Sequence, residues 1–475
     1  MGTAKDGRAV VIGAGIAGLV AARVLAEHYL DVRVLDRDDL ARVDREQRLP
    51  GRDGGQSRRR GVPQGRHIHA LLPRGREILE DLFPGLTGEL VAGGAPSGDM
   101  LGDARLHLGG HRFARTHAGL PMLSVSRPYL ERAVRDRVRS WSNVTFAPAC
   151  DVLGLVTTRD GRRVTGVRLL RRTDGSAAEV LDAELVIDAM GRGSRCPVWL
   201  EDLGYRPPAE ERVVVDLGYV TRHYRLPSDA LDGDWGTLQG PTPALARGGA
   251  LAHIEGDRWI VTLFGYGGHQ PPTDPDKFEH FADTLPFRDL SQAIRRGEAD
   301  DDPVAFRFPA SIRRRYERLA ELPQGVLPLG DAVCSLNPIY GQGMTVAALQ
   351  AQALRDHLRH ADRPDPRRWM RTVAGIVDAP WDMVVGGDMA LPEVQGPRTR
   401  QVRVLGAYVA RLHTAATHDP RLAITFARVM ALVDPPTSLL RPATAARVLL
   451  PRPRRHDRTR LDGPIPRARA DGRGC

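Results

Sequence analysis

The sequence predicts an α/β protein, α+β overall, in which a Rossmann-type parallel sheet is interleaved with an antiparallel-sheet domain and followed by a helical C-terminal region. Three observations predict this class. An apolar strand at residues 10–12 leads into a glycine-rich turn and a helix. Apolar and polar residues alternate over residues 211–268, which is typical of an antiparallel sheet. From Pro364 onward the apolar spacing is helical.

The glycine-rich turn has the spacing Gly-x-Gly-x-x-Gly and predicts a dinucleotide site. Gly13 permits the tight turn, Gly15 lets the backbone approach a pyrophosphate, and Gly18 lets the helix pack on its strand. The helix N-terminus directs unpaired N–H groups at the phosphates. A second strand ends on Asp36, eighteen residues after Gly18, where a carboxylate accepts ribose hydroxyls. This fingerprint alone is compatible with both FAD and NAD(P).

Local patterns define the remaining elements. Residues 37–65 lack apolar periodicity and predict a loop, which contains the run Arg58, Arg59 and Arg60. Helices are predicted over residues 71–83 and from Ser126. Strands are predicted at residues 143–146, 152–156, 164–170, 185–188, 213–215, 219–221, 251–254, 259–263 and 325–329.

These elements divide the chain into four regions. The predicted regions are a discontinuous FAD-type dinucleotide domain (1–75, 121–205 and 322–362), an antiparallel-sheet substrate domain (76–120 and 206–321), a helical region (363–450) and a basic tail (451–475). The tail holds eight arginines against three aspartates, and its prolines and glycines predict disorder.

Composition excludes several classes of protein. The four cysteines, at positions 150, 196, 334 and 475, form no C-x-x-C pair, which argues against a disulfide scaffold, a zinc site and a dithiol reductase. His67 and His69 have no third ligand nearby in the sequence, so we expect no metal. No apolar run precedes the first strand, which predicts a cytoplasmic protein without a membrane span.

The net charge of +10 invites a nucleic-acid interpretation, which we reject. Lys5 and Lys277 are the only lysines, and half of the net charge lies in the tail. No basic platform interleaved with aromatic residues appears. We therefore expect no nucleic-acid partner, and the sequence leaves the oligomeric state open.

A second motif decides between the two dinucleotides. The apolar strand before Gly330 ends on Asp331, a loop rich in proline and glycine follows at residues 337–341, and a helix begins near Gly343. This loop places a carboxylate near ribityl hydroxyls and turns a positive helix end inward. Such a helix end stabilises negative charge at N1 and O2 of a flavin. NAD enzymes have no need of it, so the motif favours FAD.

With these motifs the chain resembles the FAD-dependent monooxygenases of the para-hydroxybenzoate hydroxylase fold, and within them the polyether epoxidase group of polyketide pathways. The matching stretches span most of the first 350 residues; they are the opening fingerprint and residues 60–69, 126–127, 188–194 and 330–344. The resemblance implies insertion of one oxygen atom of O2 into an apolar, polyketide-like secondary metabolite, by epoxidation or hydroxylation through a flavin C4a-hydroperoxide.

The resemblance also implies roles for individual residues. The cofactor-binding residues are Gly13, Ala14, Gly15, Ile16, Ala17, Gly18, Asp36, Arg37, Arg60, Gln64, Arg127, Val152, Asp331, Gly341, Gln342, Gly343 and Met344. Pro338 and Asn337 are the catalytic candidates, because this loop lies by the flavin face where oxygen adds. The antiparallel sheet offers Tyr219, Trp235, Trp259, Phe264 and Tyr266 as substrate contacts.

One stretch departs from the hydroxylase pattern. The hydroxylases usually carry Asp-Gly-x-x-Ser-x-x-Arg where this chain has Asp-Ala-Met-Gly-Arg-Gly-Ser at residues 188–194. The epoxidase group shares the altered form, so FAD binding is still implied. This departure puts direct use of NAD(P)H in question. Two routes for the electrons of NAD(P)H are therefore open, either directly to this protein or through a separate flavin reductase.

Two other flavoprotein activities stay open. In one, FAD serves a reductase or dehydrogenase of a lipid-like substrate. In the other, FAD is structural or non-redox and the pocket folds a polyene for cyclisation, because fold alone does not separate these chemistries. Flavin halogenases are disfavoured, since the tryptophans never form the Trp-x-Trp-x-Ile-Pro run.

Overall fold

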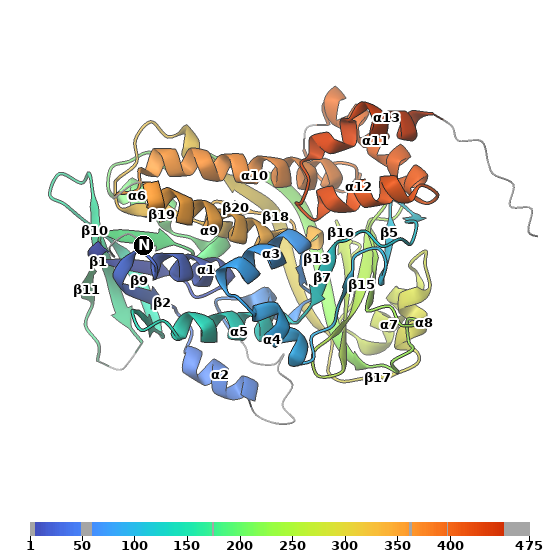
Figure 1. Cartoon of the computed structure of the whole chain (residues 1–475), viewed down its shortest axis with the longest axis horizontal. Coiled ribbons are helices and arrows are strands. Elements are labelled where there is room, and N and C mark those ends of the chain that lie inside the picture. Colours follow the sequence, from blue (N-terminus) through green and yellow to red (C-terminus); the bar gives the residue numbers. More distant parts are fainter. Residues whose placement is uncertain (1–4, 49–58, 173–174, 361–362, 397, 451–475) are drawn as a thin grey trace, which may run out of the picture.

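The computed structural model describes residues 5–48, 59–172, 175–360, 363–396 and 398–450. The predicted basic tail therefore lies outside the described residues, and so does Arg58. Two large sheets form the body of the molecule, with the helices of the first half of the chain on one side and the C-terminal helices above (Figure 1).

The first large sheet is parallel and has five strands in the order β19-β12-β1-β2-β8. Its strands are β1 (Lys5–Ile12), β2 (Tyr29–Leu35), β8 (Val144–Ala147), β12 (Leu185–Asp188) and β19 (Val326–Pro328). Val11 of β1 pairs with Val34 of β2 and with Ile187 of β12, and all three side chains are fully buried. Apolar runs of this kind are typical of parallel strands covered on both faces.

Helices pack against this sheet and against each other. The helices that share a core with this sheet include α1 (Ile16–Leu25), α3 (Pro73–Leu82), α4 (Leu86–Ala92), α5 (Arg127–Arg139), α6 (Cys196–Asp202) and α9 (Gly343–His360). Helix α5 begins where its sequence predicts, because the Ser126 hydroxyl accepts a hydrogen bond from the Tyr129 N–H and Pro128 occupies the first turn. The buried face of α1 joins the same core as the sheet.

The second large sheet has the strand order β20-β18-β13-β16-β15-β14-β5-β6, with β17 paired to β13. Its strands are β5 (Ala104–Leu108), β6 (His111–Arg112), β13 (Glu210–Arg225), β14 (Gly236–Gln239), β15 (Arg247–Ile254), β16 (Arg258–Tyr266), β17 (Glu298–Ala299), β18 (Val304–Arg314) and β20 (Cys334–Ser335). All of its pairings are antiparallel except that of β14 with β5. Alternate residues face opposite sides of such a sheet, so its two faces carry different side chains.

One face of this sheet packs on α7 (Pro275–Asp283) and α8 (Asp289–Ile294), and the other turns toward the parallel sheet. Two small antiparallel sheets complete the strands. They are β9 (Cys150–Thr157) with β10 (Val164–Arg171) and β11 (Glu179–Asp182), and β7 (Pro121–Ser124) with β3 (Ala70–Leu71) and β4 (Ser97–Asp99).

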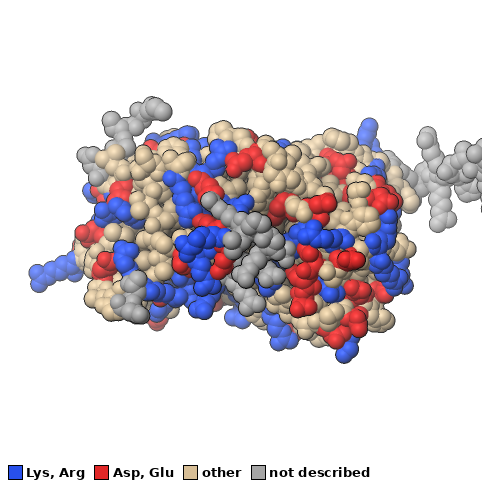
Figure 2. All heavy atoms as spheres, turned by 90° about the horizontal axis from the view of Figure 1, so that it is seen from below, with Lys and Arg blue, Asp and Glu red and all other residues tan. Residues whose placement is uncertain are grey.

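The C-terminal region is helical, as predicted. Helix α10 (Pro366–Asp388) runs alongside α9, while α11 (Arg400–Ala416), α12 (Pro420–Met430) and α13 (Pro442–Leu449) gather over the end of the large antiparallel sheet (Figure 1). No helix in the described residues is both long enough and apolar enough to cross a membrane. Arginine and acidic side chains are interspersed on the underside of the molecule (Figure 2).

The predicted fold class is confirmed, and one local expectation is wrong. The predicted loop at residues 37–65 contains a helix, α2 (Leu40–Arg48). Polar residues outnumber apolar ones in this helix, and of its apolar side chains Leu40 and Val43 are buried while Ala41 is exposed. Two buried side chains per helix are too few to reveal themselves as a periodicity in the sequence.

Candidate functional site

A cavity of about 1080 Å³ lies between the parallel sheet and the large antiparallel sheet. At one end it is lined by the turn after β1 and by Asp36, which follows the end of β2. At the other end it reaches the inner face of β13, β15 and β16. Ligands of open α/β sheets bind outside the carboxyl ends of the strands, which is where the first end of this cavity lies.

The glycines of the turn have the space and the backbone geometry of a dinucleotide site. Gly13 has a φ of +104°, and a Cβ there would lie 2.6 Å from the Ala189 carbonyl oxygen. A Cβ on Gly18 would overlap the Gly13 carbonyl oxygen, so both positions require glycine. Gly15 is different, because the nearest atom to its Cβ position belongs to the Arg127 side chain at 3.9 Å. The open space is therefore on the cavity side of Gly15, where a pyrophosphate would lie.

The N-terminus of α1 is available to an anion. No side chain caps the helix at Gly15, and Ile16 and Ala17 of its first turn line the cavity. The first N–H groups of a helix have no partner within the helix, and they carry its positive dipole end. The turn and this helix end fit the pyrophosphate of a dinucleotide.

Asp36 lies where a ribose would be held, and its carboxylate is already well bonded. Its Oδ2 accepts hydrogen bonds from Ala14 N at 2.7 Å and Arg59 Nη2 at 2.6 Å, and its Oδ1 accepts one from Asp38 N at 2.8 Å. A carboxylate has about four acceptor positions, so one acceptor position stays free for a ribose hydroxyl. The residues present thus fit the adenosine half of FAD.

Arg59 joins this end of the cavity to α5. Its guanidinium group is buried and pairs with Asp36, with Asp38 at 3.2 Å and with Glu131. The neighbouring Arg60, which we predicted to bind the phosphate region, is exposed and also lines the cavity. The charged run at residues 58–60 had indicated a basic loop, but nothing in it distinguished the inward arginine from the outward one.

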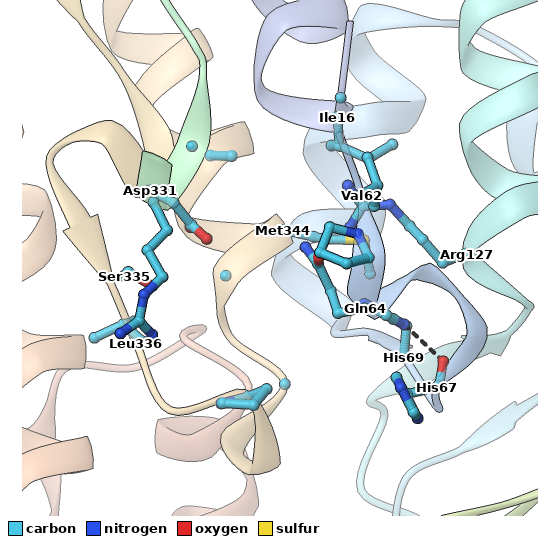
Figure 3. A pocket seen from close by; sticks show the side chains of 18 of the residues that line it. Ile16, Val62, Gln64, His67, His69, Arg127, Asp331, Ser335, Leu336 and Met344 are labelled. Atoms are coloured by element: carbon cyan, nitrogen blue, oxygen red, sulfur yellow. Dashed lines mark hydrogen bonds between the residues drawn. The ribbon is translucent and has the colours of Figure 1, made fainter. Parts of the chain in front are cut away.

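The middle of the cavity is flanked by opposite charges. Figure 3 shows Asp331 on one side of the cavity, across from Val62, Gln64, His69 and Arg127. Burial, with a contribution from the nearby Arg59, lowers the pKa of Arg127 to about 10, so it stays a cation at neutral pH. Burial raises the pKa of Asp331, and the nearby cations Arg127, Arg192 and Arg314 oppose that rise. A cation and a carboxylate so placed fit the phosphate and ribityl parts of FAD.

The second glycine loop borders the next part of the cavity. It contains the short helix η5 (Pro338–Tyr340), passes through Gly341 at a φ of +66°, and leads into α9 at Gly343. Pro338, Asn337, Gly341, Gly343 and Met344 all line the cavity. The positive end of α9 therefore faces it, as the flavin assignment requires.

Two histidines on the chain segment after η1 (Pro63–Arg66) are neutral, and of these His67 is buried and His69 half-buried. His69 Nδ1 lies 2.8 Å from the His67 carbonyl oxygen, and His67 Nδ1 lies 2.7 Å from Thr221 Oγ1, which continues to Thr262 Oγ1 at 2.6 Å. Burial lowers the pKa of each histidine to about 3. Within the described residues, no cluster of three or more His, Cys, Asp or Glu side chains could hold a metal ion.

The far end of the cavity is apolar and aromatic. Tyr219 and Phe264 lie side by side across the β13–β16 pairing, and Phe306 of β18 packs on Tyr219 with a ring separation of 5.3 Å. Further apolar lining side chains are Leu72, Met100, Leu106, Met122, Trp235, Leu238, Ala250, Ala252, Phe308, Ile339 and Met430. Such a surface fits an apolar ligand.

The structure brings most of the predicted site residues to the cavity and leaves a few outside its lining. Those outside are Ala14, Gly18, Gln342, Trp259 and Tyr266. Ala14 and Gly18 act through the turn, since Ala14 N donates to Asp36 and Gly18 packs on Gly13.

The other three residues outside the lining point elsewhere, which corrects their predicted placement. Trp259 faces the opposite side of the sheet, where it packs with Phe278 of α7, because it stands an odd number of residues from Phe264. The Tyr266 hydroxyl hydrogen-bonds with Asp388. The Gln342 side chain donates to the Met430 carbonyl oxygen at 3.3 Å.

Comparison with known proteins agrees with this architecture. Residues 11–62 match the family model of the NAD(P)-binding Rossmann-like domain. The fold is similar to that of a flavoprotein/dehydrogenase from Cytophaga hutchinsonii, with a TM-score of 0.65 and 15% identity over 93% of this chain and 96% of that one. It is also similar to pqsL, a probable FAD-dependent monooxygenase from Pseudomonas aeruginosa, with a TM-score of 0.54 and 18% identity over 88% of this chain and 99% of that one.

The protein thus has the fold of the flavoprotein monooxygenases and their relatives, with a Rossmann-type dinucleotide domain. Its sequence is 36% identical to Protein Rv3254 of Mycobacterium tuberculosis (strain ATCC 25618 / H37Rv) over 451 residues, which cover 91% of each protein. The chain belongs to the same protein family as Rv3254.

Proposed function

We propose that this protein is an FAD-dependent monooxygenase that inserts one oxygen atom of O2 into an apolar, polyketide-like substrate by epoxidation or hydroxylation. The second atom of O2 leaves as water, for which NAD(P)H supplies a hydride, that is two electrons and one proton, and solvent supplies the second proton. The reductant acts directly or through a separate flavin reductase. When bound, FAD supplies the redox chemistry with oxygen, and the chain supplies binding, orientation and a dry site.

The observation that carries the proposal is the continuity of the cavity. One space joins the glycine turn and Asp36 to the aromatic wall of Tyr219, Phe264 and Phe306. FAD extending from Asp36 past Asp331 would bring its ring system to the loop at Pro338, next to that wall. A reactive ring and an apolar ligand would then share one enclosed space, which oxygen transfer requires.

The lining residues have separate tasks in this proposal. Asp36, Arg127 and Asp331 hold the ribose, phosphate and ribityl parts by charge and hydrogen bonds. The positive end of α9 at Gly343 stabilises negative charge on the ring system. Met430, from the C-terminal region, and Phe306 line the apolar end and would reduce the access of water to the reacting atoms.

The test is oxygen transfer by the purified full-length chain loaded with FAD. We would supply NAD(P)H, with and without a flavin reductase, and a panel of apolar polyenes and hydroxyarenes under isotopically labelled O2. The proposal expects O2 consumption that rises when one of these probes is added, and one labelled oxygen atom in its product.

Three results would reject the proposal. Product formed without oxygen and without reductant indicates a non-redox cyclase. A saturated or desaturated product without labelled oxygen indicates a reductase or dehydrogenase. Failure to bind FAD at all removes the basis of all three activities.

A further inference from the structure

A buried carboxyl group lies directly behind the loop that borders the flavin end of the cavity. Asp388 is the last residue of α10, its side chain is fully buried, and it does not line the cavity. No sequence pattern distinguishes it, because an aspartate at a helix C-terminus is ordinarily a solvated and unfavourable residue.

Three donors converge on one oxygen of this carboxyl group. Asp388 Oδ1 accepts hydrogen bonds from Asn337 Nδ2 at 2.9 Å, from the Tyr340 hydroxyl at 3.1 Å and from the Tyr266 hydroxyl at 3.1 Å. Asn337 Nδ2 also lies 3.0 Å from the Tyr266 hydroxyl oxygen. Asp388 Oδ2 makes no hydrogen bond to any described residue.

Two of these donors line the cavity, and the third, Tyr266, stands on a strand of the sheet beside it. Asn337 and Tyr340 stand on either side of Pro338 and Ile339, and all four residues line the cavity. The Asn337 side-chain oxygen also accepts a hydrogen bond from Ile339 N at 3.2 Å, which fixes the turn between them. Tyr266 ends β16, two residues after Phe264 of the aromatic wall. Asp388 therefore joins the loop, the sheet and α10.

We propose that Asp388 is a positioning residue that holds the loop at residues 337–341 in place against the flavin ring system. Ionisation of Asp388 would strengthen the hydrogen bonds to this loop and so raise the affinity for FAD. The inference rests on the proposed binding of FAD. An ionised carboxylate accepts all three hydrogen bonds strongly. A protonated one holds them less strongly, because bonds to a charged acceptor are about twice as strong as neutral ones.

The surroundings of Asp388 place this change near neutral pH. Burial is the largest cause that raises the pKa of Asp388, to about 7, and the bonds from Asn337, Tyr340 and Tyr266 lower it only partly. The facing ionisable groups are the two tyrosines, whose own pKa values are raised well above the usual range, so both stay neutral donors. Among the described residues, the groups that act on this pKa are therefore neutral hydrogen-bond donors.

The experiment measures the dissociation of FAD from the full-length holoprotein by the fluorescence of the released flavin, over a pH series from about 5.5 to about 8.5. In the wild type we expect FAD to bind about fivefold more tightly above pH 7 than below it, which is the effect of strengthening a few hydrogen bonds. Asp388→Asn keeps the shape without the charge and should lose this step. Asp382→Asn is the matched control, since Asp382 is exposed on the same helix and has no bond to the loop.

A second variant guards against misfolding of Asp388→Asn. Tyr340→Phe removes one donor from the loop and should reduce the step while leaving Asp388 ionisable. Asp188, whose pKa burial raises to about 6, lies near the other side of the cavity, and any step that it causes should persist in every variant.

The outcomes separate the two proposals. FAD binding without a step near pH 7 in the wild type, or with an equal step in Asp388→Asn, overturns the role of Asp388 and leaves the proposed function standing. If the change in FAD affinity near pH 7 is the same in Tyr340→Phe as in the wild type, the role of Asp388 is overturned as well. A wild-type protein that does not bind FAD overturns the proposed function itself.

Discussion

The two ends of the cavity are built by different physical means. At the adenosine end, Arg59 is buried among Asp36, Asp38 and Glu131, and backbone N–H groups supply further polarity. At the far end, the lining of β13, β16 and β18 is aromatic, and the hydroxyls of Thr221 and Thr262 bond to each other. The charged end fixes a ligand by directed bonds, and the apolar end accepts a ligand by shape.

This difference predicts how each end tolerates substitution. A buried ion network loses stability sharply when one member is removed, because its partners keep their charge without compensation. An aromatic wall loses packing area gradually. The predictions below test this contrast.

The largest expected effect is at Arg59. Arg59→Met should destabilise the fold by about 3–5 kcal/mol, since it leaves the buried Asp36 and Asp38 without the cation that pairs with both. Glu131 would keep its ion pairs with Arg127 and Arg135. Arg60→Met is the control, and we expect a change within about 0.5 kcal/mol because Arg60 is exposed. Urea unfolding of both variants measures the difference. Equal stabilities would show that the ion network does not support this end of the cavity.

The next effect is the pH dependence that Asp388 gives to stability. Its pKa is about 7 in the folded protein and ordinary in the unfolded chain, so between about pH 4 and pH 7 only the unfolded chain loses the proton. Stability therefore falls as pH rises through this range, by up to about 4 kcal/mol, and is constant above it. Asp388→Asn lacks this contribution. The free energy of unfolding of this variant relative to the wild type should therefore rise between pH 4 and pH 7. If the two curves of stability against pH run parallel, Asp388 is not a buried ionisable group.

A third prediction distinguishes the effect of the glycine turn on stability from its effect on FAD affinity. Gly15→Ala has room for its Cβ in the protein, because the nearest atom lies 3.9 Å away, so unfolding by urea should change little. The same Cβ would stand where a pyrophosphate must approach, and FAD affinity should fall about 10- to 100-fold. Gly18→Ala, which overlaps Gly13, should instead lose stability. A Gly15→Ala protein that binds FAD normally would place the pyrophosphate elsewhere.

The smallest effects are expected at the aromatic wall. Phe306→Leu should leave FAD affinity unchanged and cost about 1 kcal/mol of stability or less, because the side chain is only partly buried. It should alter the change that an apolar polyene causes in the visible flavin spectrum. Trp259→Phe, on the opposite face of the same sheet, should not alter that change. If both variants respond alike, the inner face is not the ligand wall.

Most of the fold could be predicted from patterns that lie within one short segment of the sequence. The glycine spacing with Asp36 predicted the first parallel unit, and the strands predicted at residues 251–254 and 259–263 correspond to β15 and β16. The helix α2 escaped prediction because it buries too few apolar side chains to produce a visible period.

Site residues could be predicted where a single short segment of the sequence contains the whole binding motif. Residues such as Gly15 and Asp331 belong to such segments, and the cavity lies against them. Asp388, Arg59 and Phe306 were missed because their partners are far away in the sequence, as with Arg59 and Glu131, which are 72 residues apart. Trp259 was misplaced because an aromatic residue in a two-sided sheet is equally plausible on either face until its register is known.

The most direct test of this account is the stoichiometry of FAD binding to the full-length protein, followed in the visible spectrum before and after addition of an apolar polyene. We expect one FAD per chain and a flavin band that shifts when the polyene enters the neighbouring apolar space. A protein that stays colourless when FAD is supplied, or one whose bound flavin is unaffected by every apolar ligand tested, would contradict the shared cavity on which the proposed oxygen transfer depends.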